Sequence, residues 1–281
     1  MNYRQIIDKG TLILKSYSIP NPAFDAELLL SISLKKSREK ILLNLEKNIN
    51  DDQINCYLNL IDRRKKKEPV SLIIGKKFFW GTEFYVNKNV LTPRYETELL
   101  VERVLKAYKN SDKINVLDIG VGSGCILISL LKEKMNWKGT GVDISKLAIK
   151  KAKTNAKIQQ ITNRINFLNS DIDNLTSKKY DLIVSNPPYI NKIEYNNLNK
   201  DVKDYEPKVA LYGGIEGTDI IKKVINFSKK FLKNNGLLGI ETGYGQFYQV
   251  SEILRSNGFY ISEVVKDYQK IKRCLLAKKI K

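Results

Sequence analysis

The chain has 281 residues, of which 42% are hydrophobic, and carries a formal net charge of +19. This length fits one large domain or a large domain with a small one, and no apolar stretch approaches the length of a membrane span. The sequence has no histidine, which excludes imidazole chemistry. Its three cysteines are widely spaced, which excludes a zinc or disulfide framework. We therefore expect no metal and a reducing, cytoplasmic setting.

The positive charge is spread along the chain. Residues 1–80 carry +6 and residues 81–281 carry +13, which is a similar charge per residue. A nucleic-acid patch would concentrate basic residues on one segment. Two interpretations remain open, namely compositional drift in a chain rich in Lys, Asn and Ile, and selected binding to an anionic surface.

The N-terminal residues predict a small helical domain. Pro22 suits the start of a helix, and Ser37 is a good N-cap candidate. The basic run from Arg63 to Lys67 ends a segment that starts on two acids, so we interpret it as a solvated helix end. Pro69 then stops the helix. The expected helices are 3–17, 21–34, 37–45 and 51–67, within a domain of residues 1–75.

The next segment changes from a helical to a strand pattern. Aromatic and β-branched residues surround Gly81 and Thr82, which predicts a β-hairpin, and we take residues 76–92 as a connector. From residue 93 onward, strand and helix patterns alternate, so we expect a doubly wound, mostly parallel sheet in a domain of residues 93–281. The last two strands are joined by a short connection, so one of them should be antiparallel. The expected strands are 114–120, 137–145, 164–169, 180–186, 236–242, 259–267 and 271–279, and the expected helices are 96–110, 123–134, 146–158, 216–233 and 245–257.

A glycine-rich turn follows the first strand of this sheet. Gly120, Gly122 and Gly124 allow a tight turn and the close approach of a ligand to the backbone. A dinucleotide fingerprint would have Gly or Ala at position 125, where this chain has Cys125. The observed spacing is instead the pattern of S-adenosylmethionine-dependent methyltransferases. A glycine-rich turn without a ligand is the alternative.

Acids follow the next two strands. Asp143 can accept hydrogen bonds from both hydroxyls of a ribose, although Asp143 or Ser145 could equally cap the following helix. Asp171 can accept a hydrogen bond from an adenine amino group while Ile172 packs on the ring, although a plain surface turn is the alternative. Because ligands bind at the carboxyl ends of strands in open α/β sheets, these features predict one nucleotide-type site.

The stretch Asn186-Pro187-Pro188-Tyr189 ends the following strand. It could be a simple strand stop, because proline cannot continue a ladder. It also suits methylation of a planar NH2 group, since the Asn186 side-chain oxygen and the Pro187 carbonyl can accept both N–H protons. Tyr189 would offer a flat face to that group. No strong base is needed, which agrees with the absence of histidine.

Longer motifs resemble one family of such methyltransferases, the HemK/PrmC family, which methylates the glutamine of the Gly-Gly-Gln loop in peptide chain release factors. Residues 90–102, "VLTPRYETELLVE", resemble its Pro-Arg-Pro-Glu-Thr-Glu signature. Residues 205–217, "YEPKVALYGGIEG", resemble a second family segment, and "GIETGYGQ" and "DYQKIKR" resemble two more. The resemblance covers nearly the whole chain.

The resemblance implies a Rossmann-like class I methyltransferase fold with a mixed seven-stranded sheet, and S-adenosylmethionine as the cofactor. It implies that the N-terminal domain recognises the release factor, with no membrane and no specific nucleic acid as partner. It assigns Asn186, Pro187 and Tyr189 to catalysis, and these with Pro188, Arg94, Thr97 and Glu98 to substrate binding. The expected cofactor contacts are Gly120, Val121, Gly122, Ser123, Gly124, Asp143, Asp171, Ile172 and Asn186.

The sequence departs from the family pattern at three positions. Tyr95 stands where proline is usual, Lys270 where glycine is common, and Ile172 where an aromatic residue often follows the acid. The local shape of the substrate entrance and the adenine contacts depend on these residues. Two other functions stay open, namely methylation of adenine in DNA or RNA, which the charge of +19 suits, and a non-catalytic module that keeps the cofactor pocket.

Overall fold

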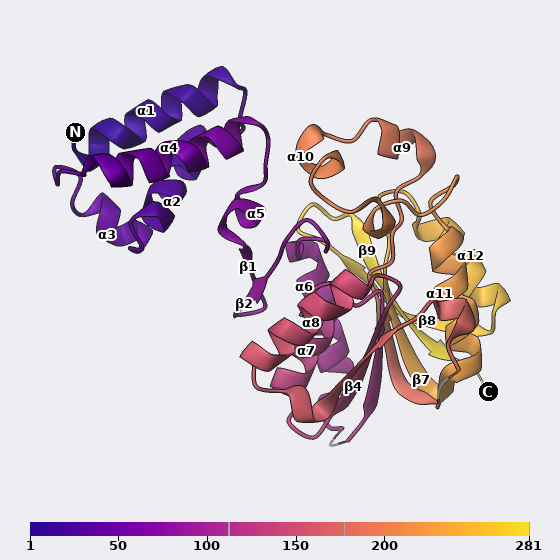
Figure 1. Cartoon of the computed structure of the whole chain (residues 1–281). Helices are drawn as coiled ribbons and strands as arrows, with labels where there is room; N and C mark the ends of the chain where they lie inside the picture. Colours follow the sequence, from indigo (N-terminus) through magenta and orange to yellow (C-terminus); the bar gives the residue numbers. More distant parts are fainter. Residues whose placement is uncertain (112, 177, 281) are drawn as a thin grey trace. The chain divides into compact units, whose positions relative to one another are not determined.

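The computed structural model describes residues 1–111, 113–176 and 178–280 and forms two compact units (Figure 1). The smaller unit consists of Met1–Gly75 with Asn199–Tyr205, and the larger unit of Lys76–Leu198 with Glu206–Lys281. The larger unit therefore includes the hairpin that follows the N-terminal helices. Among the described residues, the structure contains no helix with the length and apolar character needed to cross a membrane.

The smaller unit is a bundle of helices around its own hydrophobic core. Ser37 caps a helix as predicted, and its hydroxyl accepts the N–H of Lys40. Asn2 and Asn50 form capping boxes with the glutamines three residues later, so side chains satisfy the first N–H groups of two helices. The helices are α1 (Tyr3–Ser16), α2 (Pro22–Ser33), α3 (Arg38–Leu42), α4 (Asp51–Lys65), α5 (Val70–Ile74) and α10 (Lys200–Lys203).

The basic run at the end of α4 is not simply solvated. The Arg64 guanidinium is buried and forms an ion pair of 2.7 Å with Asp25 on α2. The Lys67 ammonium donates to the carbonyls of Tyr17 and Ser18, just beyond the end of α1. The expectation of a solvated helix end is therefore wrong for Arg64, whose side chain is buried against α2.

The larger unit contains the predicted doubly wound sheet. Its strand order is β5-β4-β3-β6-β7-β9-β8, and β9 is antiparallel to both of its neighbours while β3 to β7 run parallel. Both expectations about strand direction are confirmed. The hairpin is β1 (Lys76–Phe79) and β2 (Thr82–Tyr85), and the sheet comprises β3 (Asn115–Ile119), β4 (Lys138–Asp143), β5 (Ile165–Asn169), β6 (Tyr180–Ser185), β7 (Leu232–Glu241), β8 (Phe259–Lys266) and β9 (Lys272–Lys279).

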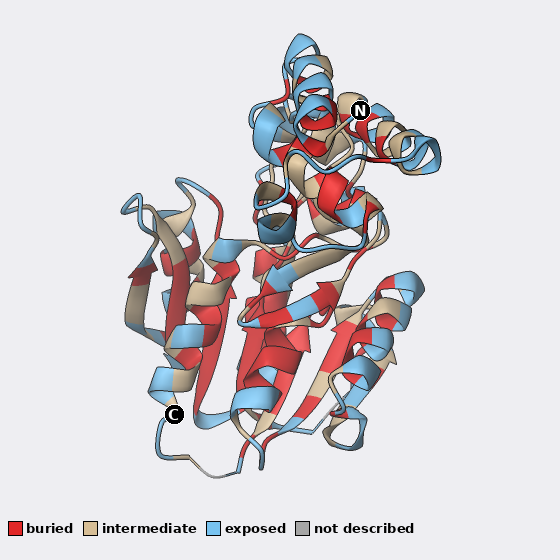
Figure 2. Cartoon of the chain, turned by 90° about the vertical axis from the view of Figure 1, so that its left-hand side faces the viewer, coloured by how far each residue is buried: buried red, intermediate tan, exposed pale blue. Residues whose placement is uncertain are grey.

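Helices cover both faces of this sheet and create two cores. Apolar residues of α6, α7 and α8 pack on one face together with the hairpin, and those of α11 and α12 pack on the other. Figure 2 shows the sheet strands as mostly buried and the outer sides of the helices as exposed. The helices are α6 (Tyr95–Ala107), α7 (Cys125–Glu133), α8 (Lys146–Ile158), α9 (Lys192–Asn196), α11 (Asp219–Phe231) and α12 (Phe247–Ser256), with short 3-10 turns η1 (Thr162–Arg164), η2 (Ile172–Asn174) and η3 (Lys208–Ala210).

The structure differs from the predicted elements in several short helices and in the segment after β6. The short α5, α9 and α10 had no strong pattern and were not predicted. Helix α11 starts at Asp219 rather than at residue 216, because Gly217 has a φ of +79° and interrupts the helix. Strand β7 starts at Leu232, four residues before the predicted start, since Leu232 already pairs with Tyr180 of β6.

The order of the strands fixes where a ligand can bind. The chain goes from β3 to β4 and β5 on one side of the sheet, and then to β6 on the other side of β3. The loops after β3 and β6 therefore diverge and leave a crevice at the carboxyl ends of these strands. Open α/β sheets bind their ligands at such a switch point.

Candidate active site

A cavity opens at the switch point in the larger unit. The residues predicted for cofactor and substrate binding gather here from the ends of four strands and from the beginning of α6. Those lining the cavity are Gly120, Val121, Gly122, Ser123, Asp143, Asp171, Ile172, Asn186, Pro187, Pro188, Arg94 and Thr97. The lining does not include Gly124, Glu98 or Tyr189.

The glycine-rich turn after β3 is held in place by the neighbouring strand. The N–H groups of Gly120 and Val121 both donate to the carbonyl of Val142 on β4. Gly120 has a φ of +75°, and a Cβ atom built on it would meet nothing within 4 Å, so its backbone is open to a ligand. At Gly124 a Cβ atom would lie 2.8 Å from Ile128, so this glycine serves the packing of α7.

Asp143 at the end of β4 is oriented by two backbone groups. One oxygen, Oδ2, accepts the N–H of Gly122, and the other, Oδ1, accepts the N–H of Ser145, both at 2.9 Å. Burial raises the pKa of the Asp143 carboxyl, and these two N–H groups oppose the rise. Ser145 caps α8 by accepting the N–H of Ala148, so Asp143 is not needed as the cap. Each oxygen keeps lone-pair capacity for a further donor.

Asp171 and Ile172 lie side by side on the cavity wall after β5. The Asp171 carboxylate accepts the N–H of Asp173 at 3.0 Å and caps η2. The backbone at Asp171 therefore forms a turn, as the alternative interpretation of a plain surface turn predicted. This turn lines the cavity, however, and Asp171 Oδ2 has no hydrogen bond from any residue within the described ranges.

Asp118 on β3 is a buried acid that sequence reasoning did not assign. It is 1% exposed, and its two carboxylate oxygens have no hydrogen-bond partner of normal geometry among the described residues. Burial raises the pKa of Asp118 to about 7, while the nearby amide of Leu127 lowers it and the charge of Asp143 raises it further. Protonation removes the charge that burial disfavours, so this carboxyl keeps its proton to a higher pH than an exposed acid does.

Asn186 ends β6 and begins a chain of hydrogen bonds. Its amide nitrogen Nδ2 donates to Thr97 Oγ1 on α6 at 3.1 Å, and Thr97 Oγ1 donates to Glu241 Oε2 on β7 at 2.7 Å. Neither Asn186 Oδ1 nor the Pro187 carbonyl accepts a hydrogen bond from any residue of the described chain. Both residues line the cavity, so two acceptors are available there for one NH2 group.

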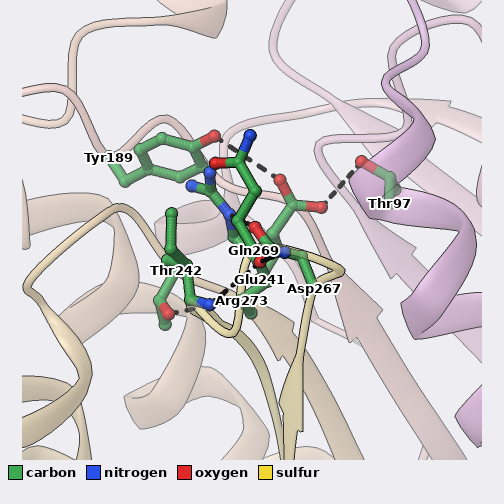
Figure 3. Close-up of polar contacts among 8 residues, drawn as sticks. Thr97, Tyr189, Glu241, Thr242, Asp267, Gln269 and Arg273 are labelled. Carbon is green, nitrogen blue, oxygen red and sulfur yellow. Dashed lines mark hydrogen bonds and ion pairs between the residues drawn. The ribbon is translucent and has the colours of Figure 1, made fainter.

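Tyr189 is anchored at both ends. Its hydroxyl approaches Glu241 Oε1 at 3.5 Å (Figure 3), and its carbonyl accepts the side-chain Nε2 of Gln246 at 2.9 Å. Its ring packs on the core that α11 and α12 cover. Burial raises the pKa of the Tyr189 phenol, so it stays neutral near neutral pH. The predicted contact of its ring with the substrate stays a prediction.

The two longer motifs meet at the cavity through Arg94. Its guanidinium forms an ion pair of 2.6 Å with Glu206, which is 6% exposed. Burial raises the pKa of Glu206, and the charge of Arg94 opposes the rise. Glu98 lies elsewhere and accepts the backbone N–H of Trp80 in the hairpin at 2.9 Å. The structure thus brings Arg94 and Thr97 to the cavity and gives Glu98 a structural contact.

Sequence reasoning noticed the segments "GIETGYGQ" and "DYQKIKR" but gave their residues no role. Glu241 stands at the carboxyl end of β7, as Asp143 does on β4, and this position is the signal that could have identified it. Asp267 organises the β8–β9 loop, where it accepts the N–H groups of Gln269 and Ile271 and pairs with Arg273 at 2.9 Å (Figure 3).

Comparison with known proteins identifies the family. The sequence profile of the PrmC N-terminal domain matches residues 5–75, and that of the methyltransferase small domain matches residues 95–202. A release factor glutamine methyltransferase of Fusobacterium nucleatum is 39% identical over 98% of this chain and 78% of its own length. Another, of Caulobacter vibrioides, is 38% identical over 95% of this chain and 92% of its own length. The chain belongs to the release factor glutamine methyltransferase family.

Membership of the release factor glutamine methyltransferase family makes this protein an S-adenosylmethionine-dependent methyltransferase. It is also 36% identical to a bifunctional methyltransferase of Rickettsia bellii, of which it spans 54%. Among solved structures, the ribosomal protein L11 methylase of Lactobacillus delbrueckii has a TM-score of 0.52 at 18% identity, covering 69% of this chain and 82% of that one. A methyltransferase of Pyrococcus furiosus has a TM-score of 0.53 at 16% identity, covering 72% and 90%. These likenesses confirm the predicted class I methyltransferase fold.

The cavity residues suit S-adenosylmethionine on physical grounds. The open space above Gly120 lets a ligand approach the backbone, and the oriented Asp143 carboxylate can accept hydrogen bonds from a ribose. The cofactor has no pyrophosphate, so Cys125 in place of glycine or alanine is no obstacle.

Proposed function

We propose that this protein methylates the side-chain amide nitrogen of the glutamine in the Gly-Gly-Gln loop of peptide chain release factors. One observation carries the proposal: Asn186 and Pro187 both line the cavity, and neither Asn186 Oδ1 nor the Pro187 carbonyl accepts a hydrogen bond from a described residue. These two acceptors match the two N–H protons of a primary amide. The names of the relatives support a release factor as the source of that amide.

The cofactor contacts follow from the same wall. We assign the ribose hydroxyls to Asp143, the adenine amino group to Asp171, and the ring face to Ile172. The turn from Gly120 to Gly124 would hold the amino-acid part of the cofactor through its backbone. Support comes from the position of these residues around one cavity, with the exception of Gly124, which supports the turn from behind.

The chemistry required of the protein is positioning. An amide nitrogen is a poor nucleophile because its lone pair is delocalised into the carbonyl. Two acceptors that bind both N–H protons fix the orientation of the nitrogen and stabilise the positive charge that develops on it as the new bond forms. Bound S-adenosylmethionine would supply a methyl group from a sulfonium, whose sulfur would keep the electron pair of the S–C bond. The methylated nitrogen becomes acidic and releases a proton to solvent, so no strong base is needed.

The helical unit is our candidate for recognising the release factor. Residues 5–75 match the PrmC N-terminal domain, which supports a function shared with the relatives. We infer a cytoplasmic location from the three unpaired cysteines and from the proposed substrate.

A labelling experiment tests the proposal. The purified protein is incubated with methyl-labelled S-adenosylmethionine and either an intact release factor or its Gly-Gly-Gln variant with Gln→Ala. We expect label in the intact factor and none in the variant. Equal labelling of the two factors would rule out the assigned glutamine.

A methyltransferase of adenine is the second candidate, because adenine also offers a planar NH2 group and the charge of +19 favours nucleic acid. An enzyme acting on a base in a duplex must extrude it and hold the surrounding strand. The same assay with DNA and RNA as acceptors separates the two functions. Labelled nucleic acid with unlabelled release factor would decide for adenine.

A further inference from the structure

Glu241 is a buried acid that touches the site without lining the cavity. It lies at the end of β7 and is 2% exposed. Figure 3 shows its two carboxylate oxygens reaching in different directions, Oε2 to Thr97 Oγ1 and Oε1 to the Tyr189 hydroxyl. Thr97 is also 2% exposed, so water does not compete for this contact.

The direction of the hydrogen bonds fixes the Asn186 amide. An ionised carboxylate only accepts hydrogen bonds, and a threonine hydroxyl has one proton to give. Thr97 Oγ1 gives that proton to Glu241 Oε2 and can therefore only accept from Asn186. Because Nδ2 must then face Thr97, Oδ1 is turned to the opposite side, where a substrate amide needs an acceptor.

We propose that Glu241 is a positioning residue that, through Thr97, holds the Asn186 amide with Oδ1 toward the substrate. The inference rests on the proposed function, in which Asn186 Oδ1 accepts a substrate N–H. A protonated Glu241 could donate instead, and Thr97 could then donate to Asn186 Oδ1. The Asn186 amide would then turn over and present its own NH2 group to the NH2 group of the substrate. Both groups are hydrogen-bond donors, so the substrate would lose an acceptor.

The surroundings of Glu241 make this reversal accessible near neutral pH. Burial raises the pKa of Glu241 to about 7. The charge of Glu96 on α6 raises it as well, whereas Thr97, Tyr189 and the Arg273 guanidinium on β9 lower it. The thiols of Cys125 and Cys274 also lie within electrostatic reach, and burial raises the pKa of each, so they remain neutral.

A matched pair of variants tests the relay through Thr97. Thr97→Val removes the hydroxyl, and Thr97→Ser keeps it. We expect Thr97→Val to lower kcat roughly 10-fold or more, since an acceptor is misoriented in the transition state, with the KM for the release factor and the Kd for S-adenosylmethionine changing far less. Thr97→Ser should restore most of the lost kcat. Thr218→Val, at a buried threonine outside the site, is the control for a lost hydroxyl and should leave kcat unchanged.

The pH dependence of kcat tests Glu241 itself. We expect the kcat of the wild type to rise with pH through about 7, where Glu241 ionises. Glu241→Gln cannot titrate and should lose this rise. A wild-type-like profile in Glu241→Gln, or a Thr97→Val variant that is well folded with kcat within about threefold of the wild type, would overturn the inference. Cofactor Kd and thermal melting report folding. A wild type that does not methylate the release factor would instead overturn the proposed function.

Discussion

At the scale of single residues, the two ends of the Asn186 amide have different tasks, one within the protein and one toward the substrate. Its nitrogen donates to Thr97, and its oxygen accepts no hydrogen bond from the residues that the structure describes, while Asn186 itself lines the cavity. An acceptor that has no partner within the protein is available to a ligand that pairs with it. The same argument applies to the Pro187 carbonyl, whose direction is restricted by the following Pro188.

Replacing Asn186 should separate chemistry from binding. Asn186→Ala removes one of the two acceptors for the substrate amide, so we expect kcat to fall on the order of 10²–10³. Cofactor affinity should be largely kept, because the glycine-rich turn and Asp143 stay in place. Single-turnover methyl transfer and cofactor titration measure the two effects. Unchanged turnover would remove Asn186 from the mechanism.

Asp118 should make stability depend on pH. Its folded-state pKa of about 7 lies above that of an unfolded Asp, near 4, so the folded state holds the proton longer. The free energy of unfolding of the cofactor-free protein should therefore fall as pH rises from about 4 to about 7. Asp118→Asn cannot titrate and should flatten this fall, by an amount on the order of a few kcal/mol. Urea unfolding at pH 5 and pH 8 measures it, and an unchanged pH difference would contradict the prediction.

Lys270 should relieve strain when changed to glycine. It has a φ of +63°, a left-handed conformation that costs an L-residue about 1–2 kcal/mol, and it stands where the family commonly has glycine. Glycine loses more chain entropy on folding, so we expect Lys270→Gly to stabilise the protein by at most about 1 kcal/mol. Lys270→Ala keeps the Cβ atom and serves as the matched control in thermal melting. An equal gain in Lys270→Ala would point to charge rather than backbone conformation.

At the scale of elements, the helical unit depends on a buried ion pair between α2 and α4. Breaking one partner of such a pair leaves an unpaired charge. Arg64→Met should therefore destabilise this unit by about 3–5 kcal/mol. The double variant Asp25→Leu with Arg64→Met removes both charges and should regain most of that stability. Urea unfolding followed by circular dichroism compares the variants. A double variant no more stable than Arg64→Met would show that packing, not the unpaired charge, is responsible.

Some parts of the fold and the site could be predicted from the sequence, and others could not. The turn after β3 and the acids after β4 and β5 were predictable, because the carboxyl ends of parallel strands meet at one edge. The burial of Arg64 had a signal that was missed, since Tyr57, Ile61 and Arg64 share one face of α4. The contact between Thr97 and Glu241 had none, because the two residues are 144 positions apart and belong to motifs with no local pattern in common.

At the scale of the whole molecule, the two units offer a division of tasks. The larger unit contains the cavity and every residue that we assign to the chemistry. The smaller unit has its own core and matches its own family profile. We propose that the smaller unit selects the release factor and that the larger one methylates it, so that one planar NH2 group is chosen among the many that a cell contains.

Locating the transferred methyl group tests the central claim most directly. A release factor is incubated with the protein and S-adenosylmethionine, digested, and sequenced by tandem mass spectrometry. The account predicts the mass of one methyl group on the side chain of the glutamine in the Gly-Gly-Gln peptide, and an unmodified peptide with Asn186→Ala. A methyl group on any other residue, or an unmodified peptide together with methylated adenine in added nucleic acid, would contradict it.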